Sequence, residues 1–508
     1  MGLRTRVGKA FQALFGLETV NMKRRSYASA SSGRLLAGWM SNNSSADAEI
    51  KGSLPKLQQR SRQIVRDTPY GKQAVRTIVG NVIGFNGIKM QSQIKKERYG
   101  KGLDVEKNDV VEELWHDWGR YDSCHTAGRL CWTDIEKLCC SSLIESGEVF
   151  VRIVNKRFGR SKIPFALEIL ESDRLDNNYE GVSNNKNDNW RMGIKHDEWY
   201  RPISYAFFTE HPGDSAFPTK KKVARHMILP ASEVIHLYLT DRPEQTRGVP
   251  WLAPVLKQLH HLDGYAESSV IKARGASALM AFISSPEGEL NDGGEIFEGD
   301  RVSEWSPGAF HYLEPGQNVT VPNFDAPNGE FEPFMRACLR GMAAGIGISY
   351  ESISKDFSQS NYSSSRLSML EDRTQYKSLQ QFFIKGLHQR VFEQWLDMAI
   401  LSGALNLPGY ETKPDKYKKV KWQPRGFEFV DPQKEVASAK EAIKAGLKTQ
   451  AQVIAEQGGD IDELMAARKA EVDMASSLGL LFDTDVATEQ KQANIEATTT
   501  SESNGGTT

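Results

Sequence analysis

The sequence predicts an α+β protein in which helices come first, a mainly antiparallel β region follows, and helices return in the second half. Apolar residues recur at helical spacing before Glu148 and after Arg247, whereas between these positions they alternate with a period of two. The chain has 508 residues, which is a prior for about three domains. With 39% hydrophobic and 25% charged residues, it can bury a core and still present a charged surface.

The N-terminal part is expected to be a flexible arm over residues 1–56, because residues 20–56 are rich in Ser, Ala, Asn and Gly. The first predicted helix follows this arm. Thr68 is a good N-cap, Pro69 suits the first helical position, and Gly84 ends the apolar stripe.

A second helix is predicted from Thr133, where Glu136 three residues later would complete a capping box. The period of two after this helix indicates strands separated by turn residues. The predicted strands are Glu148–Val154, Phe165–Leu170, Met192–Lys195, Ile203–Phe208 and Val234–Leu239.

Helical spacing returns over residues 251–275 and again over Glu332–Gly345. A turn-rich insert at 278–330 separates these two helices. Within the insert, strands are predicted at Leu279–Ile283 and Val319–Val321.

A Ser/Asn-rich loop is predicted from Ser352 to Ser365, before the longest periodic segment of the chain, Ser365–Leu401, in which Gly386 is a candidate kink. A short strand at Gly426–Val430 and a helical C-terminal region should follow. The polar sequence after about residue 484 is expected to be disordered.

The charge balance limits how strongly the protein can hold nucleic acid. Its formal net charge is −1, whereas proteins that grip nucleic acid usually carry a basic surplus. Any contact with DNA is therefore expected to be local and weak. The sequence also has no P-loop, HExxH, GxSxG or strand-associated GxGxxG motif, so we expect a protein that is not an enzyme and uses no cofactor.

The five cysteines, an odd number in a long chain, do not indicate a disulfide framework. Cys124, His125, Cys131, Cys139 and Cys140 cluster, but they lack CxxC spacing and a second histidine at a ligand offset. Ordinary buried thiols are therefore predicted in place of a zinc site.

No apolar run approaches the roughly 20 residues that are needed to span a bilayer. The basic N-terminus lacks the apolar core and cleavage site of a secretory signal, and Arg6 stands where a myristoylation motif needs Ser or Thr. These observations predict a soluble, cytosolic protein with no membrane partner.

An acidic cluster keeps one enzymatic alternative open. Glu168, Glu171, Asp173 and Asp176 could form a metal-dependent nuclease site, because paired carboxylates hold Mg²⁺ for phosphodiester cleavage. The favoured interpretation is a strand followed by a solvated turn, in which Asp173 and Arg174 form a local pair.

Several short motifs occur in a fixed order between about residues 57 and 470. Together they resemble the lambda-type family of tailed-bacteriophage portal proteins, and the ordered set is far more specific than any one motif. The motifs are Arg66-Asp67 through Pro69-Tyr70 with Ala74-Val75-Arg76 to Gly84, then Glu171–Leu175, His211–Asp214, Arg247–Leu256, Asn361–Arg366, Trp422, Pro424, Val430–Glu435 and Ala445–Lys448.

This resemblance implies a portal fold with a mixed, mainly antiparallel wing, paired stem helices, a small α/β clip, a long tunnel helix and a helical crown. The implied regions are the wing at 57–249, a stem helix at 250–277, the clip at 278–330, a second stem helix at 331–349, the tunnel loop at 350–366, the long helix and return to the wing at 367–430, the crown at 431–480 and a disordered tail at 481–508.

The resemblance also implies a function at the capsid portal vertex of the virion, after assembly in the host cytoplasm. Subunits would form a homo-oligomeric ring, usually a dodecamer, around the channel for packaging and ejection of double-stranded DNA. Partners would be the terminase large subunit, the major capsid protein and head–tail connector proteins. A head–tail adaptor that binds no DNA is the structural alternative.

The channel should be lined mainly by small neutral polar side chains, because moving DNA must not be held tightly. Lys355 and Arg366 near the loop, and Lys272 and Arg274 on the stem, are candidate phosphate-facing cations. A helix cap for the loop and a subunit–subunit salt bridge for each cation remain equal alternatives. The candidate neutral residues are Ser358, Ser360, Asn361, Ser363 and Ser364.

Overall fold

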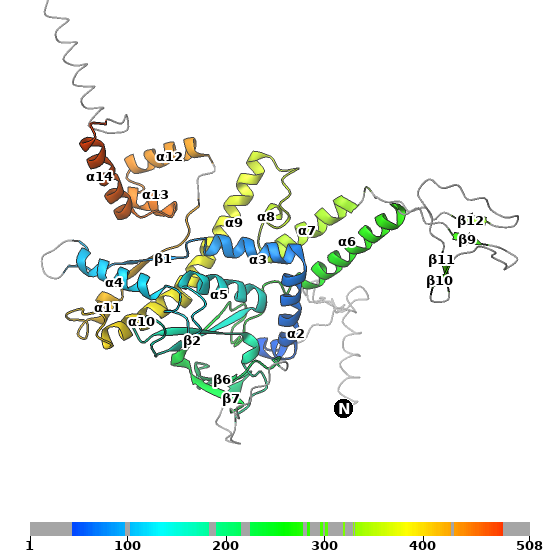
Figure 1. Cartoon of the computed structure of the whole chain (residues 1–508), viewed down its shortest axis with the longest axis horizontal. Coiled ribbons are helices and arrows are strands. Elements are labelled where there is room, and N and C mark those ends of the chain that lie inside the picture. The colour runs from blue at the N-terminus through cyan, green and yellow to red at the C-terminus, as the bar shows by residue number, and fades with distance from the viewer. Residues whose placement is uncertain are drawn as a thin grey trace, which may run out of the picture.

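The helices and sheets of the computed structural model form one body, from which a helical hairpin extends to one side and a helical C-terminal group to another (Figure 1). All pairings between its named strands are antiparallel, which confirms the mainly antiparallel part of the prediction, and a parallel pairing among the described residues occurs as an isolated bridge between His125 and Leu167. The predicted tail at 481–508 lies outside the described residues. The structure describes residues 43–96, 102–181, 189–214, 224–277, 331–427 and 431–480, with residue 329 and short strands between 282 and 320.

The first described helix lies where we expected an unstructured arm. Helix α2 spans Ala46–Asp67 and begins at Ser45, whose side chain accepts a hydrogen bond from the Ala48 backbone at 3.3 Å. Ile50 and Leu54 are buried on its inner face. The prediction of a flexible arm was therefore wrong for residues 46–56, because apolar residues spaced at four bury one face of a helix there.

Helix α3 spans Pro69–Val82 and confirms the first predicted helix, since the Thr68 side chain accepts a hydrogen bond from the Gly71 backbone at 3.2 Å.

Helix α4, Val105–Trp118, was not predicted. Its burial depends on distant aromatic residues. The ring centroid of Trp115 lies within 6.0 Å of those of Trp118, Trp132, Phe392, Trp395 and Trp422.

Helix α5, Trp132–Ser146, begins at Cys131 with Asp134 completing the capping box, so the predicted box between Thr133 and Glu136 was wrong. The Glu136 side chain is fully buried and has other partners. Its carboxylate accepts hydrogen bonds from the Ile88 backbone at 3.3 Å and lies 2.6 Å from Nε2 of His388.

Two sheets follow α5. The first has the strand order β3-β2-β8, with β2 at Glu148–Val154 as predicted, β3 at Ala166–Leu170 and β8 at Val234–Tyr238. The second has the order β4-β5-β6-β7. Its strands are β4 Asn189–Arg191, β5 Ile194–His196, β6 Pro202–Phe208 and β7 His226–Pro230.

Two details of the second sheet differ from the prediction. The predicted strand Met192–Lys195 is divided by a tight turn, in which Met192 and Gly193 have φ values of 47° and 83°. Its first half is therefore the turn that follows β4, and its second half, Ile194–Lys195, belongs to β5. Strand β7 was not predicted, although it pairs with β6 along the whole length of β7.

The projecting hairpin consists of α6, Leu256–Ser277, and α7, Phe331–Ile346 (Figure 1). Helix α6 begins five residues later than residue 251, because residues 251–255 form turns. The predicted strands of the insert are each shifted. Four short strands occur there: β9 Phe282–Ser284, which pairs with β12 Asn318–Thr320, and β10 Glu295–Phe297, which pairs with β11 Asp300–Val302.

The predicted Ser/Asn-rich loop is shorter than expected. Helix α8 occupies Tyr350–Ser354, and α9 already begins at Tyr362, so the loop is limited to residues 355–361. The long helix consists of α9, Tyr362–Phe383, a π-helical turn η5, Ile384–His388, and α10, Gln389–Leu401. A Cβ atom at Gly386 would lie 2.6 Å from the Leu237 side chain, so this glycine allows η5 to pack closely on β8.

The C-terminal region returns to the body before it becomes helical. After the short helix α11, Pro414–Tyr417, strand β13 at Val420–Gln423 pairs with β1 at Lys89–Ser92. The strand predicted at Gly426–Val430 was wrong for residues 426–427, and residues 428–430 lie outside the described chain. Gly426 instead packs against the backbone at Gln457, before the helical group α12 Pro432–Lys444, α13 Gln450–Glu456 and α14 Ile461–Ser477.

A buried ion pair joins the first sheet to the segment that leads into α6. Glu148 and Arg247 both have fully buried side chains, and Nε of Arg247 lies 2.9 Å and 3.0 Å from the two carboxylate oxygens. The carboxylate also accepts a hydrogen bond from the Gly248 backbone at 3.2 Å and lies 3.0 Å from Nε2 of His236. Burial disfavours the ionised carboxylate, but Arg247 and His236 together lower the pKa of Glu148 to about 2.

Replacing Glu148 with Gln should destabilise the protein by about 3–5 kcal/mol, because it leaves the Arg247 guanidinium buried without a counter-charge. Unfolding by urea, followed by tryptophan fluorescence, measures the change. Glu233→Gln is the matched control, since Glu233 lies 4.0 Å from Arg152 at a more exposed site, where a pair contributes about 0–1 kcal/mol. Equal losses in the two variants would contradict this assignment.

The same pair should make stability depend on pH. The pKa of Glu148 is about 2 in the folded state, below the value of about 4.3 that is typical of an unfolded chain. Its contribution is therefore present at neutral pH and is lost as the pH falls from about 5 towards 2. The difference in unfolding free energy between the wild type and Glu148→Gln should shrink between pH 6 and pH 3. A difference that stays constant would exclude this carboxylate as the source.

Candidate channel-lining segment

The residues predicted to line a channel lie on one continuous part of the structure, from α6 through α7 and α8 to the start of α9. We call residues 256–366 the stem-to-loop segment. Lys272 and Arg274 are exposed near the far end of α6, and neither has an ion pair within the part of the chain that the structure describes. The structure therefore leaves both cations available to a ligand or to a neighbouring subunit.

Lys355 ends α8 in the left-handed conformation, with a φ of 58°, and its side chain is exposed. The loop that follows is organised by its own polar groups. The Ser358 backbone donates to Asp356 at 3.0 Å, and the Ser360 hydroxyl donates to the Phe357 carbonyl at 3.0 Å. Local hydrogen bonds thus fix the shape of the loop.

Asn361 and Ser364 form a reciprocal cap at the start of α9. The Asn361 side chain accepts from the Ser364 backbone at 2.8 Å, and the Ser364 hydroxyl accepts from the Asn361 backbone at 3.2 Å. The helix-cap alternative therefore describes these two residues. Ser363 lies in the first turn with an exposed side chain.

Arg366 differs from the other predicted cations. Its guanidinium lies 3.4 Å from the Glu435 carboxylate on α12, and both side chains are partly buried. This ion pair forms within one chain, so it favours a structural contact for Arg366 over the phosphate-facing or intersubunit role that the sequence suggested. Arg366 instead connects the start of α9 to the C-terminal helical group.

Two aspartates that the sequence did not single out hold the base of the loop. Asp372 on α9 is buried and accepts hydrogen bonds from the Ser349 backbone at 2.9 Å and from the Ser352 hydroxyl at 2.9 Å. Asp356 accepts from the Tyr350 hydroxyl at 2.8 Å and lies 3.7 Å from Arg336 on α7. Hydrogen bonds from Ser358 and Tyr350 lower the pKa of Asp356 to about 2.

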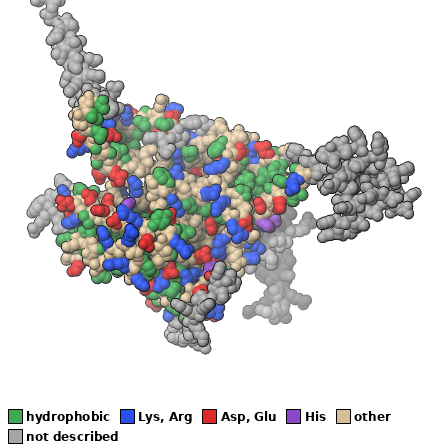
Figure 2. Space-filling model, in the orientation of Figure 1, with side chains coloured by type: hydrophobic (Ala, Val, Ile, Leu, Met, Phe, Trp, Pro, Cys, Tyr) green, Lys and Arg blue, Asp and Glu red, His purple; other side chains and the backbone are tan. Residues whose placement is uncertain are grey.

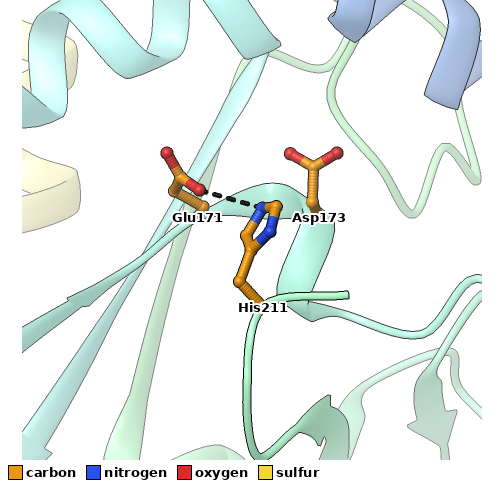
Figure 3. Close-up of side chains that lie close together, drawn as sticks. All are labelled: Glu171, Asp173 and His211. Carbon is orange, nitrogen blue, oxygen red and sulfur yellow. Dashed lines mark ion pairs between the residues drawn. The ribbon is translucent and has the colours of Figure 1, made fainter. Parts of the chain in front are cut away.

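The acidic cluster does not form the paired carboxylates of a two-metal nuclease site. Figure 3 shows Glu171, Asp173 and His211 close together, and one ligand atom from each lies within 4.8 Å of the others. However, His211 lies 3.1 Å from Glu171, and Asp173 is bonded to Arg62 at 2.8 Å. Arg62 neutralises Asp173, and the His211 ring occupies Glu171, so the cluster does not offer two free carboxylates to one Mg²⁺ ion.

The other two carboxylates point to separate basic partners. Glu168 lies 3.1 Å from Arg152 and 3.7 Å from Arg174, whereas Asp176 lies 2.8 Å from His226. The predicted local pair between Asp173 and Arg174 was therefore wrong, because the sheet brings Arg174 to Glu168. These four acidic residues stabilise contacts between segments that surround the two sheets.

The five cysteines are free thiols, as the sequence predicts. Cys124, Cys139 and Cys140 are buried, and burial raises the pKa of Cys124 to about 12. Within the described residues, the cysteines and His125 do not converge into a metal-binding group. No described helix is both long and apolar enough to cross a bilayer.

Chains in solved structures superpose on this chain with TM-scores below 0.5. The virion of a native gene transfer agent particle contains a chain that is 14% identical, with a TM-score of 0.42, over 80% of this chain and 93% of that chain. A chain from the neck of the native particle, computed with C12 symmetry, is 13% identical with a TM-score of 0.41 and covers 84% of this chain.

Curated relatives match over most of the sequence. The probable portal protein of Halomonas phage phiHAP-1 is 30% identical over 468 residues, which cover 90% of this chain and 88% of the relative. Portal protein B of Escherichia phage lambda is 21% identical over 481 residues, covering 88% and 89%. A family model described as phage portal protein, lambda family, matches residues 32–380. The chain therefore belongs to the lambda family of phage portal proteins.

Proposed function

We propose that this chain is a subunit of the portal ring at the capsid vertex, where it forms the channel for packaging and ejection of viral DNA. The observation that carries the proposal is the family match over residues 32–380, which includes the wing, the projecting hairpin and the start of the long helix. Relatives with the same span are portal proteins. The mature location would be the virion, after assembly in the host cytoplasm.

The projecting hairpin supports a ring because it exposes apolar side chains that a single subunit cannot bury. Tyr265 and Phe334 pack together with their ring centroids 5.0 Å apart and remain 38% and 50% exposed. Val270 and Ile271 are about as exposed on another side of α6. Head-to-tail contacts that close a ring, most simply a dodecamer, would cover these groups.

The other parts of the chain can be assigned to the regions of a portal subunit. Residues 57–249 and 367–430 would form the wing against the major capsid protein, and 431–480 the crown. The hairpin helices, 250–277 and 331–349, would form the stem, and 278–330 the clip that docks the terminase large subunit and later the head–tail connectors. ATP hydrolysis would belong to the terminase, and the portal would act as a conduit.

Contact with DNA in such a channel would be weak and repeated. Lys272, Arg274 and Lys355 supply cations that are exposed and unpaired in the described chain, while Ser358 and Ser360 of the loop present neutral polar groups. Figure 2 shows acidic and basic side chains interspersed over the visible face, without a broad basic surface. Repetition around a ring multiplies each contact without strengthening any one of them.

The ring proposal predicts that purified protein forms closed particles with a central pore in electron-microscope class averages. Replacing Tyr265 and Phe334 together with Asp should yield smaller species in light scattering, because two charges would lie in the stem contact. Phe85→Asp is the control, since Phe85 is 81% exposed and lies outside the stem. Monomers or pore-free particles from the wild type would overturn the proposal.

The channel proposal predicts a shallow salt dependence of binding to double-stranded DNA. Lys272→Gln, Arg274→Gln and Lys355→Gln should each lower the affinity, and each should reduce the slope of log K against log salt by about 1 per lost phosphate contact. Arg366→Gln is the matched control, because Arg366 is paired with Glu435. An unchanged slope in the first three variants, or an equal change in the control, would remove these residues from the channel.

A further inference from the structure

A polar cavity of about 540 Å³ lies in the wing, outside the stem-to-loop segment. It is enclosed by the turn between β5 and β6, the short helix η4 at Ala231–Glu233, the loop at residues 244–246 and the start of α10. Neither the channel nor the ring contact proposed above uses this cavity. Its volume falls in the range of sites that bind small molecules or peptide side chains.

The wall of the cavity is held in place before any ligand arrives. Tyr238 donates from its hydroxyl to the Gln245 carbonyl at 3.0 Å. The Gln245 side-chain oxygen accepts from the Asp241 backbone at 2.9 Å. Thr246 donates from its backbone and its hydroxyl to Asp47 at 2.9 Å and 3.0 Å. These bonds fix the loop and so pre-organise the site.

Two arginines that line the cavity have no counter-ion. Arg201 and Arg390 are exposed, and neither guanidinium forms an ion pair or hydrogen bond within the described ranges. Glu244 is the carboxylate of the lining, so the site has a surplus of positive charge. Other arginines of the same region are neutralised by carboxylates, among them Arg152 by Glu168 and Arg247 by Glu148.

Two buried polar groups complete the site. Tyr205 is only 3% exposed, and its hydroxyl has no hydrogen bond to any described residue, although it lines the cavity. Burial raises the pKa of Tyr205, so the hydroxyl keeps its proton and can donate it. His196 is 6% exposed, and its Nδ1 has no partner. A ligand that accepts hydrogen bonds would pair with the Tyr205 hydroxyl and would satisfy His196 Nδ1, which otherwise stays buried and unpaired at a cost.

We propose that this cavity binds the carboxylate of an acidic side chain presented by a protein partner of the wing. Arg201 and Arg390 would pair with the carboxylate, which matches the fork of a guanidinium, and Tyr205 would donate to it. Ile194, Pro202 and Val234 line the same cavity and suit the aliphatic stem of a glutamate. Glu244 offsets one of the two guanidinium charges, and the remaining positive surplus suits a single carboxylate better than a multiply charged polyphosphate such as the DNA backbone.

The test uses the full-length protein and glutarate, a dicarboxylate that mimics a glutamate side chain. Isothermal titration at constant ionic strength should give saturable binding. Arg390→Gln and Arg201→Gln should each weaken that binding about tenfold or more. Tyr205→Phe removes only the hydroxyl, so it should weaken binding while the fold stays intact. Arg60→Gln, at an exposed arginine on α2, should leave the affinity for glutarate unchanged.

Three results would contradict the proposal. No saturable binding of glutarate to the wild type would overturn the proposal. Equal weakening by Arg60→Gln would do the same, because it would show a general effect of net charge. Inorganic phosphate is the second ligand. If phosphate bound as tightly as glutarate and depended on Arg390 and Tyr205, the site would be a phosphate site and the assignment to a protein carboxylate would be wrong.

Discussion

The fully buried pair of Glu148 and Arg247 is the contact on which the relation between the wing and the projecting hairpin depends. It closes a crossing of two backbones at Gly147 and Gly248, where a Cβ atom on either glycine would lie within 2.2 Å of the other strand. Only glycines allow so close an approach. Arg247 then fixes the residues that lead into α6, and through them the direction in which the hairpin leaves the body.

A second buried pair places the long helix. Glu136 from α5 and His388 from η5 are both fully buried and lie 2.6 Å apart, and Glu136 also binds the Ile88 backbone. The π-helical turn lets His388 reach this position while Gly386 leaves room for Leu237. Either member of each pair would be costly to bury without the other, so the first pair holds the segment before α6 against β2 and the second holds η5 against α5.

Two parts at the periphery of the structure differ from this rigid centre. The hairpin and the loop at residues 355–361 carry exposed apolar groups and, among the described residues, unpaired cations, whereas the centre is held by fully buried polar pairs. Arg366 and Asp372 connect the start of α9 to neighbouring elements, Arg366 through Glu435 and Asp372 through Ser349 and Ser352. A conduit for DNA requires this combination of a stable frame and weak, repeated contacts.

The sequence by itself determined the elements whose signals are local, and the family. The cap at Thr68, the strand at Glu148–Val154 and the apolar stripe of the long helix each depend on neighbours within a few residues. Tertiary structure alone decided the partners of Glu136, Asp173 and Arg366. Those partners come from segments that are distant in the sequence. The spacing of residues along the chain does not indicate which distant charged side chain the folded protein brings within 4 Å. The same reason explains why α4 was missed, because its burial depends on aromatic residues from distant segments, whereas α2 carries a local signal in the spacing of Ile50 and Leu54 that the Ser- and Asn-rich composition obscured.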